Sequence, residues 1–212
     1  MITIKTFVFG PFQENTYLLF DETKECIIVD PGCYDNRECL QLADFISDNK
    51  LKPVKLVNTH CHLDHVFGNG FIADTFSLKP EISKQEKPVL DSYLISAKQY
   101  GFEAAPSPQP VAYLSEGDKI TFGNSTLEIF FTPGHSPGSI TLYSPAQKFM
   151  IAGDVLFFGS IGRTDLPGGN FETLISSIKN KLFSLGDDYT VYCGHGPSTT
   201  IGHERLNNPF LV

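Results

Sequence analysis

The motif at residues 59–65 reads Thr59-His60-Cys61-His62-Leu63-Asp64-His65. Four of its residues are of metal-ligating type, in the order H-x-H-x-D-H, and it holds three of the six histidines of the chain. Imidazole nitrogen and carboxylate oxygen suit zinc, iron or manganese. Burying so many polar groups together would be costly without a cation to pair them. The motif therefore predicts a metal site rather than a solvated loop.

The residues before the motif suggest how it is presented. Residues 54–57, which follow Pro53, are typical of a buried strand. If strand geometry continues through the motif, His60 and His62 lie on one side, because side chains alternate along a strand, and Cys61 points into the fold. We expect Asp64 and His65 to come where the chain enters a loop or helix, so that they can turn toward a second point.

Composition limits the class of protein. The chain has 212 residues, 41% of them hydrophobic and 19% charged, which is typical of a soluble globular protein with its own core. A net charge of −8 without any basic stripe argues against a nucleic-acid partner. No apolar run reaches the roughly 18 residues of a spanning helix, so we expect no membrane partner. No oligomeric state is predicted.

The N-terminal residues and the cysteines indicate a compartment. Residues 1–7 alternate like a strand and lack a basic region followed by an apolar one, so we expect no signal peptide. The five cysteines form an odd set without a C-x-x-C pair, which fits reduced thiols. We therefore expect a cytoplasmic protein.

Periodicity predicts alternating strands and helices. The predicted strands are 2–8, 15–20, 25–30, 54–57, 111–114, 119–122, 125–131, 139–143, 148–151 and 190–193. The predicted helices are 36–49, 66–76, 86–100 and 171–185. The order strand, helix, strand around the motif indicates α/β layering. Prolines at 106, 108 and 110 predict a loop, but ligand candidates lie on both sides of it. We therefore predict one domain over residues 1–212.

Further ligand candidates follow predicted strands in the second half. His135 lies in Thr132-Pro133-Gly134-His135-Ser136-Pro137-Gly138, Asp154 ends Ile151-Ala152-Gly153-Asp154, and His195 follows residues 190–193. Asp30 ends an earlier strand, just before Pro31-Gly32. Five of the six histidines thus lie at predicted strand ends, where a rigid scaffold commonly presents functional groups.

Together these residues resemble the metallo-β-lactamase superfamily: H-x-H-x-D-H, a histidine in T-P-G-H, an aspartate in G-D and a histidine in G-H-G occur in that order. The resemblance covers nearly the whole chain and implies an αββα sandwich of two mixed β-sheets flanked by helices. It implies two divalent transition-metal ions, zinc first, with iron or manganese as alternatives. One ion would be held by His60, His62 and His135, the other by Asp64, His65 and His195, with Asp154 bridging both.

Within the superfamily, the motif and Gly162-Arg163-Thr164-Asp165 look most like glyoxalase II (hydroxyacylglutathione hydrolase) and its short bacterial relatives. This implies hydrolysis of a small-molecule hydroxyacyl thioester. The metals would lower the pKa of a bound water, and the resulting hydroxide would attack the carbonyl. Asp64 would be the catalytic residue that orients the hydroxide.

Three residues have weaker assignments. Asp30 would hold a ligand histidine or its loop, or else only begin a turn. Phe158 and Arg163 could line the acyl pocket. For Phe157 and Phe158 core packing is the favoured interpretation, and for Arg163 an ion pair with Asp165.

One departure concerns the C-terminal part. Glyoxalase II has a C-terminal helical extension that contacts glutathione, whereas here the residues after His195 include one arginine, Arg205, and no lysine. We therefore expect no such extension. His203, in this polar segment, is expected at the surface or in packing rather than as a ligand.

The alternative functions are a mononuclear iron persulfide dioxygenase with a similar G-R-T-D loop, and a non-enzymatic metal-binding module. A β-lactamase is disfavoured by the missing export signal. A nuclease is disfavoured by the acidic charge.

Overall fold

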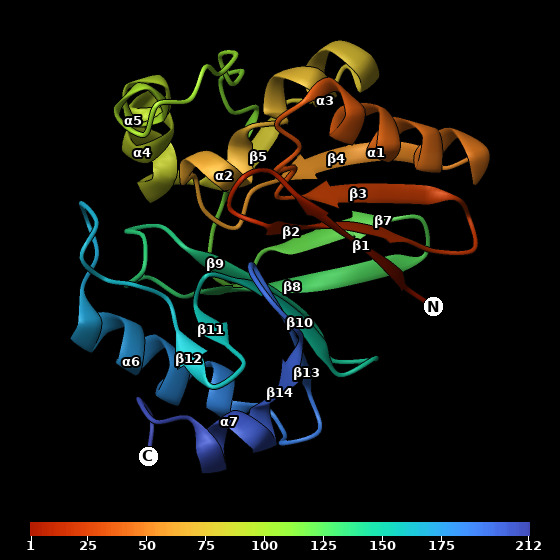
Figure 1. Cartoon of the computed structure of the whole chain (residues 1–212). Helices are drawn as coiled ribbons and strands as arrows, with labels where there is room; N and C mark the ends of the chain where they lie inside the picture. Colours follow the sequence, from red (N-terminus) through yellow and green to blue (C-terminus); the bar gives the residue numbers. More distant parts are fainter. The chain divides into compact units, whose positions relative to one another are not determined.

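The computed structural model of the chain describes residues 1–212, which fall into two units. The first unit comprises Met1–Ile82, Lys87–Tyr113 and Thr121–Ser125. The second comprises Ser83–Glu86, Leu114–Ile120 and Thr126–Val212. A six-stranded sheet forms the main part of each unit (Figure 1).

The first sheet has the strand order β1-β2-β3-β4-β5-β6. Its strands are β1 (Thr3–Phe9), β2 (Glu14–Phe20), β3 (Glu25–Val29), β4 (Lys52–Val57), β5 (Pro80–Ser83) and β6 (Ala112–Leu114). The strands β1, β2 and β3 pair antiparallel, whereas β4 pairs parallel with both β3 and β5. Strands β2 and β3 are buried almost throughout. Residues 17–20 and 26–29 supply apolar side chains to the core, whereas Glu14, Asn15 and Thr16 at the start of β2 are polar although buried.

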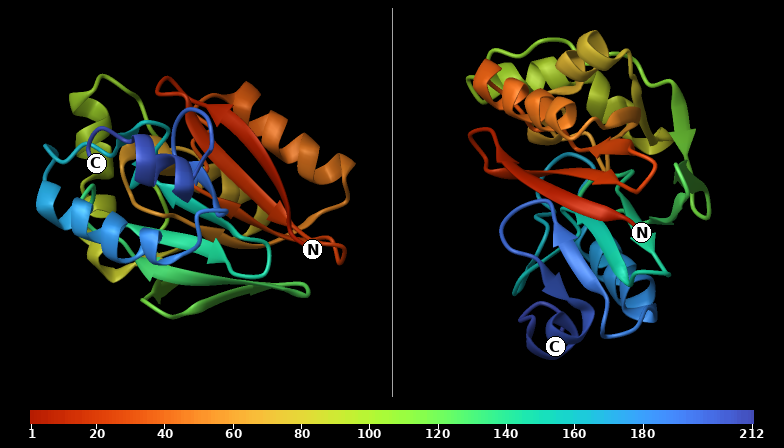
Figure 2. Two further views of the ribbon diagram at one scale, coloured as in Figure 1. Left: turned by 90° about the horizontal axis from the view of Figure 1, so that it is seen from below. Right: turned by 90° about the vertical axis from the view of Figure 1, so that its right-hand side faces the viewer.

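Helices pack on one face of this sheet (Figure 2). They are α1 (Asn36–Asp48), α2 (Leu63–Val66), α3 (Asn69–Phe76), α4 (Lys87–Asp91) and α5 (Tyr93–Gln99). Asp35 caps α1 because its side chain accepts a hydrogen bond from the amide of Glu38. Leu42 and Ile46 of α1 and Ile72 of α3 then join one core with the buried side chains of β1 to β4. The sheet therefore presents its strand ends from a rigid layer.

The second sheet has the order β14-β13-β10-β9-β8-β7. Its strands are β7 (Lys119–Phe122), β8 (Ser125–Phe131), β9 (Ile140–Ser144), β10 (Phe149–Gly153), β13 (Thr190–Cys193) and β14 (Thr199–Thr200). Strand β9 runs antiparallel to β8 and β10, and β13 runs parallel to β10. Strands β8, β10 and β13 consequently point the same way and end at one edge.

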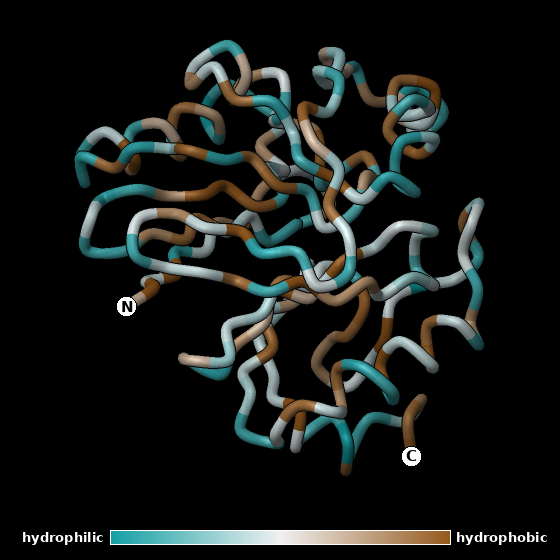
Figure 3. The backbone as a smooth tube through the Cα atoms, turned by 180° about the vertical axis from the view of Figure 1, so that it is seen from behind, coloured by the Kyte–Doolittle hydropathy of each residue, from teal (hydrophilic) through white to brown (hydrophobic).

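Two helices and a small hairpin complete the second unit. The helices are α6 (Phe171–Asn180) and α7 (Ile201–Asn207), and the hairpin is formed by β11 (Leu156–Phe157) and β12 (Ser160–Ile161). Leu174 and Ile178 of α6 and Ile201 of α7 lie in one core with Met150 and Val191 of the sheet. Apolar and polar segments alternate along the helices in Figure 3, as expected of helices with one buried face.

Several predicted elements differ from the structure. The predicted helix 66–76 begins earlier, at Leu63, and a turn at Phe67-Gly68 divides it into α2 and α3. The predicted helix 86–100 is divided into a short 3₁₀ turn (Lys84–Glu86), α4 and α5. The predicted helix 171–185 ends at Asn180, and a 3₁₀ turn (Leu182–Ser184) follows. Local periodicity does not reveal such breaks, because both halves keep an apolar face.

Four strands and one helix were not predicted: β5, β11, β12, β14 and α7. The strands have only two to four residues, too few to show a period. Helix α7 lies in the segment described above as polar, where it is capped by the Thr200 side chain, which accepts from the amide of His203. No helix of the structure is both long and apolar enough to span a membrane.

Candidate metal centre

Two parallel strands bring the first group of candidate residues to one sheet edge. Strand β3 ends before Asp30 and β4 ends before residues 58–65, and the Asp30 amide donates to the carbonyl of Val57 at 3.0 Å. Because parallel neighbours end at the same edge, Asp30 lies beside the histidine motif although 29 residues separate it from Thr59.

The three histidines of the motif lie together. The ring centroids of His60 and His62 are 4.8 Å apart, and those of His60 and His65 are 4.0 Å apart. One ligand-type atom from each of Asp30, His60 and His65 lies within 4.8 Å of the others. Strand β4 ends at Val57, however, so the expectation that strand alternation aligns His60 with His62 is wrong. A short irregular segment brings their rings together instead.

Asp30 holds both the motif and one of its rings. One carboxylate oxygen accepts from the Thr59 amide at 2.7 Å, and the other accepts from the Thr59 hydroxyl at 2.5 Å. The second oxygen also lies 3.1 Å from Nδ1 of His65. Asp30 is 1% exposed and has a positive φ of 49°, a conformation that aspartate tolerates better than most residues. A carboxylate on Nδ1 leaves the other nitrogen of His65, Nε2, for a metal.

Helix α2 carries Asp64 and His65, where the sequence predicted either a loop or the start of a helix. Oδ2 of Asp64 lies 3.9 Å from Nε2 of His65, and the Asp64 side chain is 14% accessible. The buried Asn58 side chain donates to the carbonyl of His65 at 2.9 Å and so fixes the helix against the end of β4. Cys61 is buried, as predicted.

Sequence reasoning missed Glu14, a fully buried residue of this region. Its carboxyl oxygen Oε1 is 3.8 Å from Nδ1 of His65, and burial raises its pKa well above the usual range. Glu14 is the first residue of β2, and no local pattern distinguishes it from a strand-end glutamate at the surface.

The second unit collects three candidates from three strand ends. His135 follows β8, Asp154 follows β10 and His195 follows β13. The amide of Gly194 donates to the carbonyl of Gly153 at 2.8 Å, so the ends of β10 and β13 lie side by side. Oδ2 of Asp154 lies 3.5 Å from Nε2 of His135 and 3.5 Å from Nε2 of His195. Parallel strand ends thus unite residues that are far apart in sequence.

The chemistry of this second group fits a cation. Nδ1 of His135 is 2.7 Å from the carbonyl oxygen of Arg163. Since a carbonyl oxygen only accepts, Nδ1 donates to it, and in the neutral ring Nε2 keeps its lone pair. Nε2 lies 3.5 Å from Oδ2 of Asp154, and a cation bound by both atoms would stabilise this pairing of a neutral imidazole with a carboxylate. The donor set is therefore the one that zinc, iron or manganese takes.

A buried glutamate fixes the loop that carries His135. Glu86 is fully buried, and its Oε1 accepts from the Ser136 hydroxyl at 2.5 Å and from the Gly138 amide at 2.6 Å. A Cβ at Gly138 would come 2.7 Å from the backbone nitrogen of Glu86, so the two segments need a glycine to pack. Sequence reasoning missed Glu86, which it treated as the first residue of a helix.

The remaining predicted residues follow Asp154. Arg163 forms the predicted ion pair with Asp165 through two contacts, of 2.6 and 2.7 Å, and this pairing lowers the pKa of Asp165 to about 2. Core packing is wrong for Phe158, which is 55% exposed at the hairpin tip and stacks on His203 with ring centroids 4.9 Å apart. Phe157 packs against the core, with its ring 6.2 Å from that of His195.

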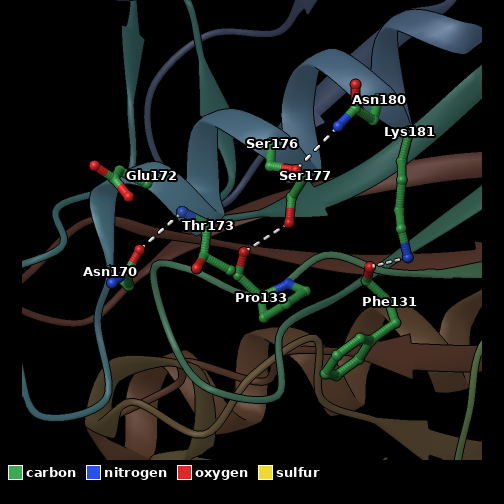
Figure 4. Close-up of a pocket in the computed structure, with 9 residues that line it drawn as sticks. All are labelled: Phe131, Pro133, Asn170, Glu172, Thr173, Ser176, Ser177, Asn180 and Lys181. Carbon is green, nitrogen blue, oxygen red and sulfur yellow. Dashed lines mark hydrogen bonds between the residues drawn. The ribbon is translucent and has the colours of Figure 1, made fainter.

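A groove of about 560 Å³ beside α6 is a different feature (Figure 4). Its polar side chains bond with one another or with backbone: Ser177 donates to the carbonyl of Pro133, and Asn180 donates to Ser176. Lys181 donates to the carbonyl of Phe131 and to Glu116. None of the sequence-predicted site residues lines this groove. It is not the candidate site.

Comparison with known proteins shows the family to which the chain belongs. The family model described as "Metallo-beta-lactamase superfamily" matches residues 9–195. A probable metallo-hydrolase of Bacillus subtilis, YqgX, is 38% identical over 95% of this chain and 94% of its own length. The hydroxyacylglutathione hydrolase GloC of Haemophilus influenzae is 38% identical over 94% of this chain and 93% of its own length.

Solved structures agree with the fold. The B3 metallo-β-lactamase BLEG-1 has a TM-score of 0.91 and 37% identity, covering 99% of this chain and 100% of its own. TTHA1623, solved in a di-iron-bound form, has a TM-score of 0.88 and 35% identity, covering 98% and 100%. The predicted fold class, with two mixed sheets flanked by helices, is confirmed.

Proposed function

The chain belongs to the metallo-β-lactamase superfamily of metal-dependent hydrolases, and on that premise we propose that it hydrolyses small hydroxyacyl thioesters. The observation that carries the proposal is the pair of strand-end groups, one in each unit, in each of which one imidazole, His65 or His135, is held through Nδ1 and offers Nε2 to a metal. The similarity to a hydroxyacylglutathione hydrolase supports the choice of substrate.

We assign the metal-binding residues as the sequence predicts them. His60, His62 and His135 would hold one divalent ion, Asp64, His65 and His195 a second, and Asp154 both. Zinc is the first choice for these ligands, and iron is an alternative that the di-iron form of a 35% identical protein supports. When bound, such ions lower the pKa of a water toward neutrality and polarise a carbonyl.

The protein's own groups then orient the reactants. Asp64, 14% accessible, offers a carboxylate oxygen that orients the attacking water and accepts its proton. Asp30 keeps His65 from turning, because it accepts from Nδ1 while it also holds Thr59. The thiolate leaving group needs no strong acid, since a thiol of pKa about 8.5 is already a stable leaving group near neutral pH.

Contacts to the thiol part of the substrate are expected to be weak. The two arginines that could bind a carboxylate in the second unit are both engaged: Arg163 pairs with Asp165, and Arg205 pairs with Asp187 at 2.9 Å. Arg205 also donates to the carbonyl of Phe183. Phe158 and His203 offer exposed aromatic surface instead. We therefore propose that the acyl group, more than the thiol part, determines which substrates are used.

Hydrolysis of a β-lactam amide is the second candidate. The 37% identity and TM-score of 0.91 to a B3 metallo-β-lactamase favour it. A β-lactam and a thioester both offer an activated carbonyl. They differ in the leaving group, since the β-lactam nitrogen must take up a proton and a thiolate need not.

One experiment compares these activities on the same protein. Metal content per chain is measured on protein purified without added metal, and release of thiol from a lactoyl thioester is compared with opening of a chromogenic cephalosporin. Oxygen consumption on a persulfide is the third assay. Asp64→Asn is the test variant, and Asp91→Asn, at an exposed residue paired with Lys87, is the matched control.

We expect the parent and Asp91→Asn to hydrolyse the thioester at similar rates. The rate should fall strongly in Asp64→Asn. Cephalosporin opening with a larger kcat/KM than thioester hydrolysis would replace the proposal by the second candidate. Oxygen consumption without hydrolysis would indicate a dioxygenase.

A further inference from the structure

Glu14 is a buried carboxyl group for which the proposed function has no use. It is fully buried at the start of β2. Its Oε2 accepts from the Thr16 hydroxyl at 2.8 Å, and that hydroxyl accepts from the amide of Gly32 at 2.9 Å. Glu14 is thereby tied to the turn that follows Asp30.

The other oxygen of Glu14 faces His65. Oε1 has no hydrogen-bond partner and lies 3.8 Å from Nδ1 of His65, while Oδ2 of Asp30 lies 3.1 Å from the same nitrogen. Two carboxyl groups, from β2 and from the end of β3, therefore border one imidazole N–H. Asp30 also accepts from the amide and the hydroxyl of Thr59, so its carboxylate is shared among three donors, of which the ring of His65 is one.

The packing around Glu14 shows that its place is tightly defined. A Cβ at Gly32 would collide with Oε2 of Glu14 and with the backbone oxygen of Asp64. Only a residue without a side chain lets Glu14 approach the segment that carries Asp64 and His65. A buried carboxyl oxygen without a hydrogen bond is costly, which indicates a role beyond stability.

We propose that Glu14 is a second positioning residue for His65, which together with Asp30 sets the orientation of its imidazole ring toward the metal. The inference rests on the proposed function, in which His65 binds a metal. Partners of metal-binding histidines typically change metal affinity by about 10–100-fold when they are removed. We expect Glu14, at the longer distance, to be at the lower end of that range.

Cobalt(II) binding to the metal-free protein tests the inference without a substrate. Affinity and the visible absorption spectrum of bound cobalt are measured for the parent, Glu14→Gln, Glu14→Leu and Asp30→Asn. Glutamine keeps the volume and an oxygen that can accept from Thr16, whereas leucine keeps only volume. The matched control is Asp21→Asn, a buried carboxylate of the same unit that bonds Thr23, Asn124 and Ser125.

We expect about tenfold weaker cobalt binding and an altered spectrum for Glu14→Leu. For Glu14→Gln we expect binding about threefold or more weaker and an altered spectrum, because its one oxygen accepts from Thr16 and an amide NH₂ then faces Nδ1 of His65. Asp21→Asn should lower the unfolding temperature but leave cobalt binding and the spectrum unchanged. Equal cobalt affinity and spectra in Glu14→Leu and Asp21→Asn would overturn the role of Glu14. If Glu14→Leu does not fold, a Glu14→Gln variant that unfolds at a lower temperature and matches the parent in cobalt spectrum and affinity would overturn it. A parent that binds cobalt but hydrolyses no thioester would overturn the proposed function alone.

Discussion

The first unit gathers its histidines within six residues, whereas the second unit collects His135, Asp154 and His195 from the ends of three strands. The two groups are also held differently. In the first group, side chains hold the histidines in place. Asp30 accepts hydrogen bonds from Thr59 and His65, and the Asn58 side chain donates to the carbonyl of His65. In the second group, backbone groups do much of this. The amide of Gly194 donates to the carbonyl of Gly153, and the carbonyl of Arg163 accepts from the ring of His135.

This difference indicates where each group is vulnerable. In the first group, ring orientation depends on a few carboxylate and amide side chains, so single substitutions should disturb it. In the second group, backbone contacts survive substitution, but one side chain, Asp154, faces both histidines. Loss of Asp154 should therefore have the largest effect of any single change.

Asp154→Ala is the test with the largest expected effect. If Asp154 binds both metals, its loss should lower the metal content at both sites. Activity should fall by about 10³-fold or more, equivalent to roughly 4 kcal/mol of transition-state stabilisation. His60→Ala and His135→Ala should each empty one site only. Elemental analysis of dialysed protein checks this, and equal metal content in Asp154→Ala and the parent would contradict the shared role.

Asp64→Asn separates catalysis from metal retention in the first group. Asparagine keeps size and shape but removes a charged oxygen that orients water and accepts its proton. We expect kcat to fall by about 10² or more, as for loss of a positioned acid–base group. Measurements at matched metal occupancy isolate this effect. Retained activity at full occupancy would mean that Asp64 only fills space.

The difference between the two groups also explains what the sequence could predict. The first group is visible as a motif, because its members are neighbours in the chain. The members of the second group could be found only as single residues at strand ends. They lie together because β8, β10 and β13 end at one edge of the sheet. Glu14 and Glu86 were missed because their contacts, with His65 and with Ser136, are 51 and 50 residues distant. No local pattern encodes such contacts.

A comparison of Glu86→Gln with Asp30→Asn tests how each group is held. Glu86 contacts the loop that carries His135, through Ser136 and Gly138, whereas Asp30 contacts the ring of His65 itself. We therefore expect Asp30→Asn to weaken metal binding by about 10–100-fold and Glu86→Gln by about tenfold or less. Glu204→Gln is the control, since this buried carboxylate holds Gly159 and Thr199 instead. A larger loss of metal affinity in Glu86→Gln than in Asp30→Asn would contradict this prediction.

The smallest expected effect concerns the thiol part of the substrate. Binding energy from a thiol carrier would normally assist reaction at the carbonyl, but Arg163 and Arg205 are occupied by Asp165 and Asp187. Breaking either pair to bind a substrate carboxylate would exchange one ion pair for another with little gain. Replacing glutathione by a smaller thiol with the same acyl group should therefore cost less than about tenfold in kcat/KM, or 1.4 kcal/mol.

The control for this comparison is Asp165→Asn, which releases Arg163. If the pair with Asp165 is what prevents Arg163 from binding a carboxylate, the variant should prefer the glutathione thioester more strongly than the parent does, chiefly through a lower KM. Phe158→Ala should affect both thioesters alike, because exposed aromatic surface does not distinguish a carboxylate. A hundredfold preference of the parent for the glutathione thioester would contradict the argument, since such a preference requires a cation that is free to bind the carrier.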